Sequence, residues 1–155
     1  MILEKVIAGS GVIAIEGNPH AEISSVCNDS RKVAHGSLFI AVKGFASDGH
    51  TYIATAIGKG ACAIVCEDMD MARSQVAQAG AEGITLVQVG SSRHALAIIA
   101  ANFYDNPSEK LTLVGITGTN GKTTTVTLLH RMFTAMGYSC GLLSTIANYV
   151  GSRGS

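Results

Sequence analysis

The sequence has few of the residues that mark nucleic-acid-binding proteins. Its 155 residues include no Trp and only 5% aromatic residues, and 11 Lys and Arg balance 11 Asp and Glu. A chain without net charge has no field that draws it to nucleic acid or to an anionic membrane. The low aromatic content argues against a surface on which bases stack. We therefore expect no nucleic-acid partner.

Long apolar runs are also missing. No stretch approaches the roughly 18 residues that a membrane-spanning helix needs. Residues 6–15 are uncharged and follow Lys5, but glycines interrupt them and no small-residue cleavage site follows, so a secretory signal is not expected. The sequence therefore predicts a cytoplasmic protein without membrane insertion, and we expect a monomer.

The cysteines are scattered without the spacing of a metal finger or a redox motif. Cys62 and Cys66 lie in one apolar run, where strand alternation predicts that both side chains point to the same face. We interpret them as small buried apolar residues, not as metal ligands, and no disulfide is expected.

Short β-rich apolar runs alternate with longer helical patterns along the chain. This alternation predicts an α/β fold with a largely parallel sheet. The predicted strands are residues 11–15, 23–27, 37–42, 61–66, 84–89, 111–117 and 139–143. The predicted helices are residues 50–59, 69–79, 91–104 and 122–136.

A cluster of turn-forming residues at 105–108 separates the chain into two parts. Pro107 cannot continue a helix, and a new strand pattern follows the cluster. We place a domain boundary there, with a first domain at 1–107 and a second at 108–155. The second part holds about one strand–helix–strand (βαβ) unit of a mostly parallel sheet, so we expect a truncated domain of a longer protein.

The second part contains a glycine-rich loop between a predicted strand and a predicted helix. The run Thr117-Gly-Thr-Asn-Gly-Lys-Thr-Thr124 has the context of a P-loop, which binds nucleotide phosphates. Gly118 and Gly121 let successive N–H groups face phosphate oxygens, and the helix start adds donors and its dipole. Lys122 supplies a positive charge near the β- and γ-phosphates, and Thr123 supplies a hydroxyl for Mg²⁺.

These features predict an ATP site made of one continuous segment. Its residues are Gly118, Thr119, Asn120, Gly121, Lys122, Thr123 and Thr124. The loop departs from the general pattern because Ile116 stands where the first glycine is usual. The alternative is a glycine-rich turn whose Lys-Thr-Thr merely starts a helix, and the flanking strand and helix favour nucleotide binding over it.

The loop resembles the ATP loop of the Mur ligase family, and further motifs extend the resemblance over nearly the whole chain. Residues 28–33 (Asn-Asp-Ser-Arg-Lys-Val), 36–41 and 44–50 are similar to the family's first, nucleotide-sugar-binding domain. Residues 118–124 and 144–148 look more like the MurE-type branch, although Ser144 replaces the usual glycine.

The resemblance implies an ATP-dependent ligase of peptidoglycan precursor synthesis. A MurE-type ligase adds a third amino acid, diaminopimelate or lysine, to UDP-N-acetylmuramoyl-L-Ala-D-Glu through an acyl phosphate. The resemblance also implies that ATP and Mg²⁺ are cofactors and that Lys122 is the catalytic residue of this segment. The family keeps its other catalytic parts in later sequence, so we expect this chain alone to be inactive.

The resemblance also places contacts to the uridine diphosphate on Asn28, Ser30 and the loop Phe45-Ala46-Ser47. Ser30 follows a strand end, and Phe45 lies in a glycine-bracketed turn where its ring can pack on uracil. The residues alone leave an alternative, a turn with an internal ion pair between Asp29 and Arg31. His50 is interpreted as the start of a helix.

The sequence motifs alone leave several alternative functions open. The dipeptide-adding Mur ligase shares the Asp-Ser-Arg and Asp-Gly-His patterns of this chain. A folylpolyglutamate-type ligase has Gly-Lys-Gly-Ser at residues 121–124, where this chain has Gly-Lys-Thr-Thr. A P-loop kinase or GTPase needs a nearby Walker-B-like Asp, which is absent here. The remaining alternative is a non-catalytic nucleotide-sugar-binding module.

Overall fold

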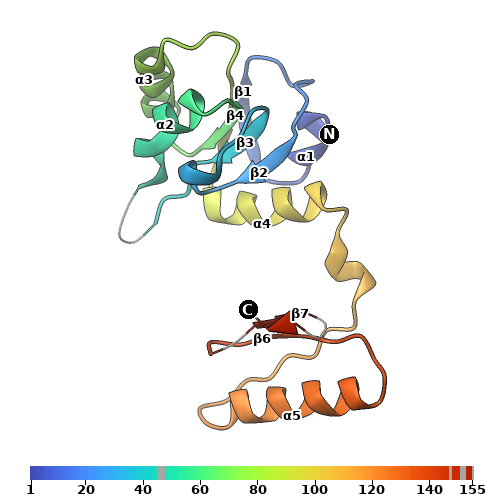
Figure 1. The fold of residues 1–155 in the computed structure, drawn as a ribbon. Coiled ribbons are helices and arrows are strands. Elements are labelled where there is room, and N and C mark those ends of the chain that lie inside the picture. Colours follow the sequence, from blue (N-terminus) through green and yellow to red (C-terminus); the bar gives the residue numbers. More distant parts are fainter. Residues whose placement is uncertain (45–47, 147, 151–152, 155) are drawn as a thin grey trace. The chain divides into compact units, whose positions relative to one another are not determined.

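The chain forms two compact units. The computed structural model describes residues 1–44, 48–146, 148–150 and 153–154. The first unit is Met1–Leu111 and the second is Thr112–Ser155. Figure 1 labels the helices and strands of both.

The first unit is built on a five-stranded sheet in the order β1-β5-β4-β3-β2. Its parallel strands are β2 (Ser25–Cys27), β3 (Ser37–Ile40), β4 (Ala61–Cys66) and β5 (Thr85–Val89). At one edge, β1 (Val12–Glu16) pairs antiparallel with β5. The predicted α/β class with a mostly parallel sheet is confirmed for this unit.

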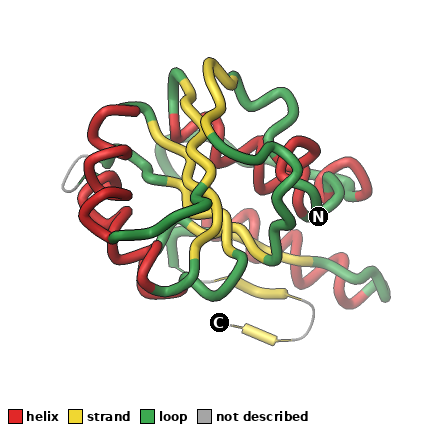
Figure 2. The backbone as a smooth tube through the Cα atoms, turned by 90° about the horizontal axis from the view of Figure 1, so that it is seen from above, coloured by secondary structure: helices red, strands yellow, loops and turns green. Residues whose placement is uncertain are grey.

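Helices cover both faces of this sheet, as Figures 1 and 2 show. One face packs against α1 (Leu3–Val6) and α4 (Ser92–Phe103), and the other against α2 (Ile53–Gly58) and α3 (Met69–Ala79). The connections contain short 3₁₀ helices, namely η1 (Ser30–Lys32), η2 (Gly49–Tyr52) and η3 (Pro107–Lys110). No helix in the described part of the chain is both long and apolar enough to cross a bilayer.

Two apolar cores result from this layering. Val65 of β4 lies in the core beneath α1 and α4 together with Ile99. Its neighbour Ile64 lies in the core beneath α2 and α3 together with Ile53. Successive side chains of a strand point to opposite faces, so strands covered on both sides are continuous apolar runs in the sequence.

Cys62 and Cys66 lie on opposite faces of the sheet, so the prediction that they share one face is wrong. The pairing of β4 with β3 skips a residue between Ala61 and Ala63, which makes Cys62 a β-bulge and reverses the alternation. Cys62 packs on the α1–α4 side and Cys66 lies in the other core. Burial raises the pKa of the Cys66 thiol to about 11, which fits a buried apolar residue.

Side-chain caps mark the starts of the α-helices α3 and α4. The predicted limits of α3 are confirmed, and the Asp68 carboxylate accepts a hydrogen bond from the Met71 N–H at 2.9 Å. The helix α4 begins after Ser91, whose hydroxyl accepts from the His94 N–H at 3.4 Å. The predicted helix 50–59 is divided into η2 and α2.

The second unit consists of α5 and a small antiparallel sheet. Its elements are α5 (Lys122–Ala135), β6 (Gly141–Leu143), β7 (Asn148–Val150) and β8 (Arg153–Gly154). The start of α5 is where the sequence predicts it. The predicted strand 111–117 is wrong, so the strand–helix–strand unit does not form.

The segment 111–117 lacks a neighbour that would make it a strand. Among the described residues no strand pairs with it, and the Leu113 side chain is 73% exposed. A β-strand is stable only when another strand satisfies its backbone N–H and C=O groups. Of the apolar residues described in the second unit, Leu142 alone is buried.

Gly60 is required at the connection between α2 and β4. Its φ is +99°, and an added Cβ would lie 2.9 Å from the Cα of His35. We therefore expect Gly60→Ala to lower the free energy of unfolding by about 1–3 kcal/mol, measured by urea denaturation. Gly58→Ala is the matched control, because an added Cβ there meets no atom within 4 Å. An equal loss in both variants would contradict this explanation.

Candidate functional site

The carboxyl ends of the parallel strands meet at one edge of the first unit's sheet. Asn28 follows β2, Glu67 follows β4 and Gly90 follows β5 directly, and Lys43 lies shortly after β3. Ligands of open α/β sheets bind at this edge. The edge is therefore the candidate binding site of the first unit.

The predicted uridine contacts lie only partly within the described chain. Asn28 is exposed directly after β2, and Ser30 is half-buried as the first residue of η1. Phe45, Ala46 and Ser47 lie outside the described residues. The structure thus places Asn28 and Ser30 together at the carboxyl edge of the sheet.

An ion pair shapes the turn that carries Ser30. Asp29 accepts a hydrogen bond from the N–H of Arg31 at 3.0 Å, and the Arg31 guanidinium Nη2 donates to Asp29 Oδ2 at 2.9 Å. These hydrogen bonds lower the pKa of the Asp29 carboxyl to about 2. The internal ion pair that the sequence left open is therefore present, and it orders the turn around Ser30.

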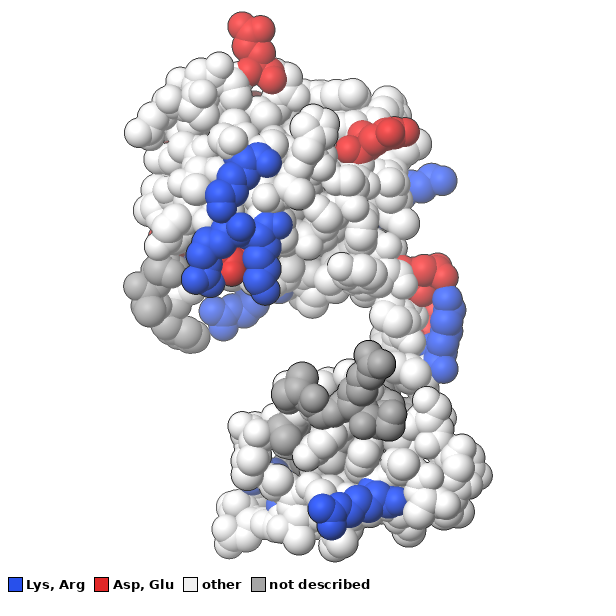
Figure 3. All heavy atoms as spheres, viewed as in Figure 1, with Lys and Arg blue, Asp and Glu red and all other residues white. Residues whose placement is uncertain are grey.

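Positive charge gathers beside this turn. The Lys59 ammonium donates to the carbonyl oxygen of Arg31 at 3.1 Å, and Lys32 ends the same 3₁₀ helix. Figure 3 shows Lys and Arg side chains gathered on one face of the first unit, with acidic atoms among them. Such a surface attracts anionic ligands, diphosphates included.

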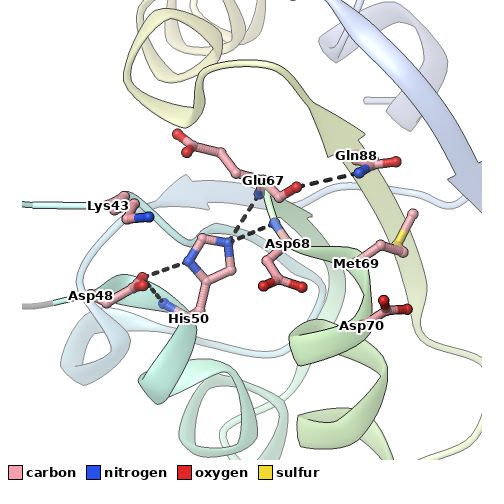
Figure 4. A pocket seen from close by; sticks show the side chains of 8 residues that line it. All are labelled: Lys43, Asp48, His50, Glu67, Asp68, Met69, Asp70 and Gln88. Carbon is pink, nitrogen blue, oxygen red and sulfur yellow. Dashed lines mark hydrogen bonds and ion pairs between the residues drawn. The ribbon is translucent and has the colours of Figure 1, made fainter.

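A pocket of about 390 Å³ opens at the same edge of the sheet (Figure 4). Acidic side chains dominate its lining, which consists of Lys43, Asp48, His50, Glu67, Asp68, Met69, Asp70 and Gln88. The described residues contain no group of three or more His, Cys, Asp or Glu side chains that could hold a metal ion. The negative charge of this pocket disfavours a phosphate.

Both ring nitrogens of the buried His50 are used in hydrogen bonds within the pocket wall. Nε2 accepts from the N–H groups of Glu67 at 3.0 Å and Asp68 at 3.3 Å, so it carries no proton. Nδ1–H therefore donates to Asp48 Oδ1 at 2.5 Å. His50 does lie in the short helix η2, but the sequence interpretation missed these contacts. The signal for them is the set of polar residues that lie shortly after three predicted strands, namely Asp48 and His50, Glu67, and Ser92.

Glu67 extends this network to α4. Its Oε1 accepts from the N–H and from the hydroxyl of Ser92, both at 2.7 Å, and these hydrogen bonds lower the pKa of Glu67 below its ordinary value. The Ser92 hydroxyl accepts in turn from the Lys43 N–H at 3.2 Å. Burial works to raise the pKa of Asp48, but hydrogen bonds from the backbone and ring of His50 outweigh it, and the net shift is downward.

The glycine loop of the second unit has a left-handed backbone at both predicted glycines. The φ angle is +143° at Gly118 and +76° at Gly121, values that other residues rarely adopt. Gly121 is the N-cap of α5, and within the described part of the chain no side chain caps the start of this helix. The first N–H groups of α5 are therefore left without a side-chain acceptor, as an anion-binding helix start requires.

The Lys122 ammonium lies against its own loop. It donates to the carbonyl oxygens of Gly118 and of Thr119, the latter at 3.3 Å. Thr123 is half-buried in the first turn of α5, and Thr119, Asn120 and Thr124 are exposed beside it. The predicted ATP residues thus form one accessible loop with its cation close to the helix start.

The chain matches two family models in sequence order. Residues 22–104 match the model of the Mur ligase family, catalytic domain. Residues 116–154 match the Mur ligase middle domain. The two matches lie in different structural units.

Curated relatives are similar along almost the whole chain. The UDP-N-acetylmuramoyl-L-alanyl-D-glutamate--2,6-diaminopimelate ligase of Cytophaga hutchinsonii is 49% identical over 150 residues, which is 97% of this chain and 30% of the relative. The ligase of the same name from Clostridium perfringens is 40% identical over 154 residues, again 30% of its length. The chain therefore spans about 30% of the length of these relatives.

Solved structures share the fold. The MurF ligase of Thermotoga maritima in complex with ADP has a TM-score of 0.52 and 31% identity, over 74% of this chain and 24% of that one. A crystal structure of MurF from Acinetobacter baumannii has a TM-score of 0.54 and 26% identity, over 74% of this chain and 23% of that one.

The Asp29–Arg31 ion pair predicts an unusually acidic carboxyl group. Asp29 should titrate at about pH 2 in the wild type and closer to 3.8 in Arg31→Gln, measured by NMR of the side-chain carboxyl carbon. Because the folded-state pKa is lowered, the stabilisation is complete above pH 3.8 and is lost as the pH falls through about 2. Lys32→Gln, which leaves the pair intact, is the control. An unchanged Asp29 pKa in Arg31→Gln would show that the pair does not form.

Proposed function

The chain belongs to the Mur ligase family, and we propose that it supplies the uridine-binding and phosphate-binding parts of an ATP-dependent ligase. The ligase adds diaminopimelate to UDP-N-acetylmuramoyl-L-Ala-D-Glu, as the names of the relatives at 49% and 40% identity suggest. The observation that carries the proposal is the uncapped glycine loop at the start of α5 with the Lys122 ammonium against it. Residues 1–107 form the uridine-binding domain, and residues 108–155 begin the ATP-binding domain.

The glycine loop is the part of the phosphoryl-transfer machinery that this chain provides. Backbone N–H groups from Gly118 to Thr124 and the Lys122 ammonium bind the β- and γ-phosphates of ATP. They neutralise negative charge while the γ-phosphoryl group passes to the side-chain carboxylate of D-glutamate. The amino group of diaminopimelate then attacks the acyl phosphate, an amide bond forms, and inorganic phosphate leaves.

Mg²⁺ fits the same loop. The Thr123 hydroxyl is a hard oxygen donor in the first turn of α5, and Mg²⁺ binds through few protein oxygens together with phosphates and water. When bound, the ion neutralises phosphate charge and fixes the orientation of the phosphates. Thr123 would hold the ion, and Lys122 would remain the cation that the protein itself contributes.

The carboxyl edge of the first unit binds the uridine diphosphate end of the acceptor. The Asn28 amide and the Ser30 hydroxyl can each donate and accept hydrogen bonds with uracil or ribose. The basic side chains beside η1 suit the diphosphate, whereas the acidic pocket that His50 helps to line does not. Residues 45–47 complete the proposed contacts.

Addition of D-alanyl-D-alanine to a tripeptide acceptor is the second candidate, because one solved structure similar to this chain is named as a D-alanyl-D-alanyl ligase and others are named MurF ligases. Their identities of 31% and 26% are lower than those of the diaminopimelate-adding relatives, which favours the first candidate. The choice of amino donor distinguishes the two reactions.

Phosphate release by the complete ligase tests the proposed reaction. We expect release when UDP-N-acetylmuramoyl-L-Ala-D-Glu, ATP and diaminopimelate are all present, and none when one is omitted. The 155-residue chain by itself should release none. Release that requires the tripeptide acceptor and D-alanyl-D-alanine would favour the second candidate. Release from ATP alone would contradict both.

Lys122→Ala in the complete ligase is expected to abolish detectable ATP binding, a loss of about a hundredfold or more, in isothermal titration calorimetry. The substitution removes the ammonium group while leaving the glycine loop and the helix start in place. Lys110→Ala is the control, because Lys110 pairs with Asp105 outside the loop. An unchanged ATP affinity of Lys122→Ala would disprove the assignment.

A further inference from the structure

We propose that Asn120 is a modification site, at which the empty glycine loop loses ammonia spontaneously and thereby loses its affinity for ATP. The consequence for ATP rests on the proposed function of this loop, whereas the chemical step does not. Asn120 is the only asparagine of the sequence that precedes a glycine. Asparagine is among the thermolabile residues of proteins, and a following glycine has no side chain to hinder attack by its backbone nitrogen.

The step is an intramolecular substitution at the Asn120 side chain. The Gly121 nitrogen bonds to Asn120 Cγ, the bond between Cγ and Nδ2 breaks, and Nδ2 leaves as ammonia with the proton that the Gly121 nitrogen gives up. The product is a cyclic succinimide. Water then opens the ring at either carbonyl carbon. Attack at Cγ gives aspartate, and attack at the backbone carbon gives isoaspartate, in which the chain continues through Cγ.

Both reacting groups are accessible in the glycine loop. Asn120 and Gly121 are exposed, and within the described part of the chain neither the Asn120 side-chain amide nor the Gly121 N–H makes a hydrogen bond. A Cβ added at Gly121 would meet no atom beyond its chain neighbours within 4 Å. The space in which the succinimide ring forms is therefore open.

Asp48 and Gly49 show the opposite arrangement, although their sequence permits the same ring closure with loss of water. The Asp48 carboxylate accepts from Nδ1–H of His50 at 2.5 Å, and the Gly49 N–H donates to the Val42 carbonyl oxygen at 2.9 Å. A Cβ added at Gly49 would lie 2.6 Å from the Val42 nitrogen, so the surrounding space is filled. A following glycine is therefore not sufficient, and the open structure of the loop distinguishes Asn120.

The charge of the loop favours the reaction. Ring closure passes through a tetrahedral intermediate with negative charge on Asn120 Oδ1. Gly121 is the N-cap of α5, where the helix dipole is positive, and the Lys122 ammonium lies against the carbonyl oxygens of Gly118 and Thr119. Fixed positive charge beside a developing oxyanion stabilises the transition state. The features that suit a phosphate therefore also suit this intermediate.

Modification at Asn120 opposes phosphate binding, and bound phosphate opposes modification. Aspartate and isoaspartate each add a negative charge to the loop, and isoaspartate also inserts a carbon into the backbone and displaces the N–H groups that follow. Repulsion between this charge and the phosphates should weaken ATP binding about tenfold or more. When ATP is bound, the Gly121 N–H donates to a phosphate oxygen and its nitrogen keeps its proton. The loop is therefore modified while it is empty.

The test follows Asn120 by mass spectrometry in the complete ligase, aged at neutral pH. Trypsin releases residues 111–122, in which Asn120 is the only asparagine, and residues 94–110, which contain Asn102. Asn102 is the internal control, because its amide donates to the carbonyl oxygens of Val6 at 3.0 Å and Ala8 at 2.8 Å. A synthetic peptide of residues 111–122 gives the rate of an unconstrained pair. We expect Asn102 to stay intact and the empty loop to react within about tenfold of the peptide's rate.

Ligand and variants test the link to ATP. A non-hydrolysable ATP analogue with Mg²⁺ at about 100 times its Kd leaves about 1% of the loops empty and should slow the modification about a hundredfold. Asn120→Asp should bind ATP about tenfold or more weakly than the wild type before any ageing. Asn120→Gln, whose longer side chain closes a ring far more slowly, should keep its own initial ATP affinity on ageing, whereas the wild type loses affinity as Asn120 is modified.

Each outcome bears on a separate statement. An empty loop that stays intact while the synthetic peptide reacts would overturn the modification site and leave the ATP site standing. In a ligase that binds ATP, wild-type affinity in Asn120→Asp, or modification that the ATP analogue does not slow, would overturn the link between the two. Absence of ATP binding by the unaged ligase would overturn the proposed function together with this link, but not the modification itself.

Discussion

Parallel hydrogen bonding between β2, β3, β4 and β5 determines where the first unit can bind a ligand. Because each pair is parallel, the carboxyl ends align at one edge, and residues far apart in sequence meet there. Buried apolar side chains on both faces fix the register, since a slip by one residue would send each side chain to the opposite core. The turn around Ser30 and the network around His50 both depend on this alignment.

The features that the sequence predicts well are local ones. The limits of α3 follow from the helical pattern of residues 69–79. The glycine loop is also local, because residues 118–124 are contiguous and the function proposed for them depends on two glycines, a cation and a helix start. The motif and the start of α5 could therefore be identified before the fold was known.

The features that the sequence does not predict depend on pairing between distant segments. The bulge at Cys62 exists only because β4 pairs with β3 in a shifted register, and alternation within β4 cannot reveal it. The apolar segment 111–117 has the composition of a strand, yet a strand also needs a partner. The network through Lys43, Asp48, His50, Glu67 and Ser92 joins three strand ends, so no single motif contains it.

A crystal structure of the complete ligase with Mg²⁺ and a non-hydrolysable ATP analogue tests the phosphate loop most directly. The β- and γ-phosphates should lie against the N–H groups from Gly118 to Thr124, and the Lys122 ammonium should leave the Gly118 and Thr119 carbonyl oxygens to contact them. A nucleotide bound elsewhere, with Lys122 still hydrogen-bonded to its own loop, would contradict the assignment of this loop as the ATP site.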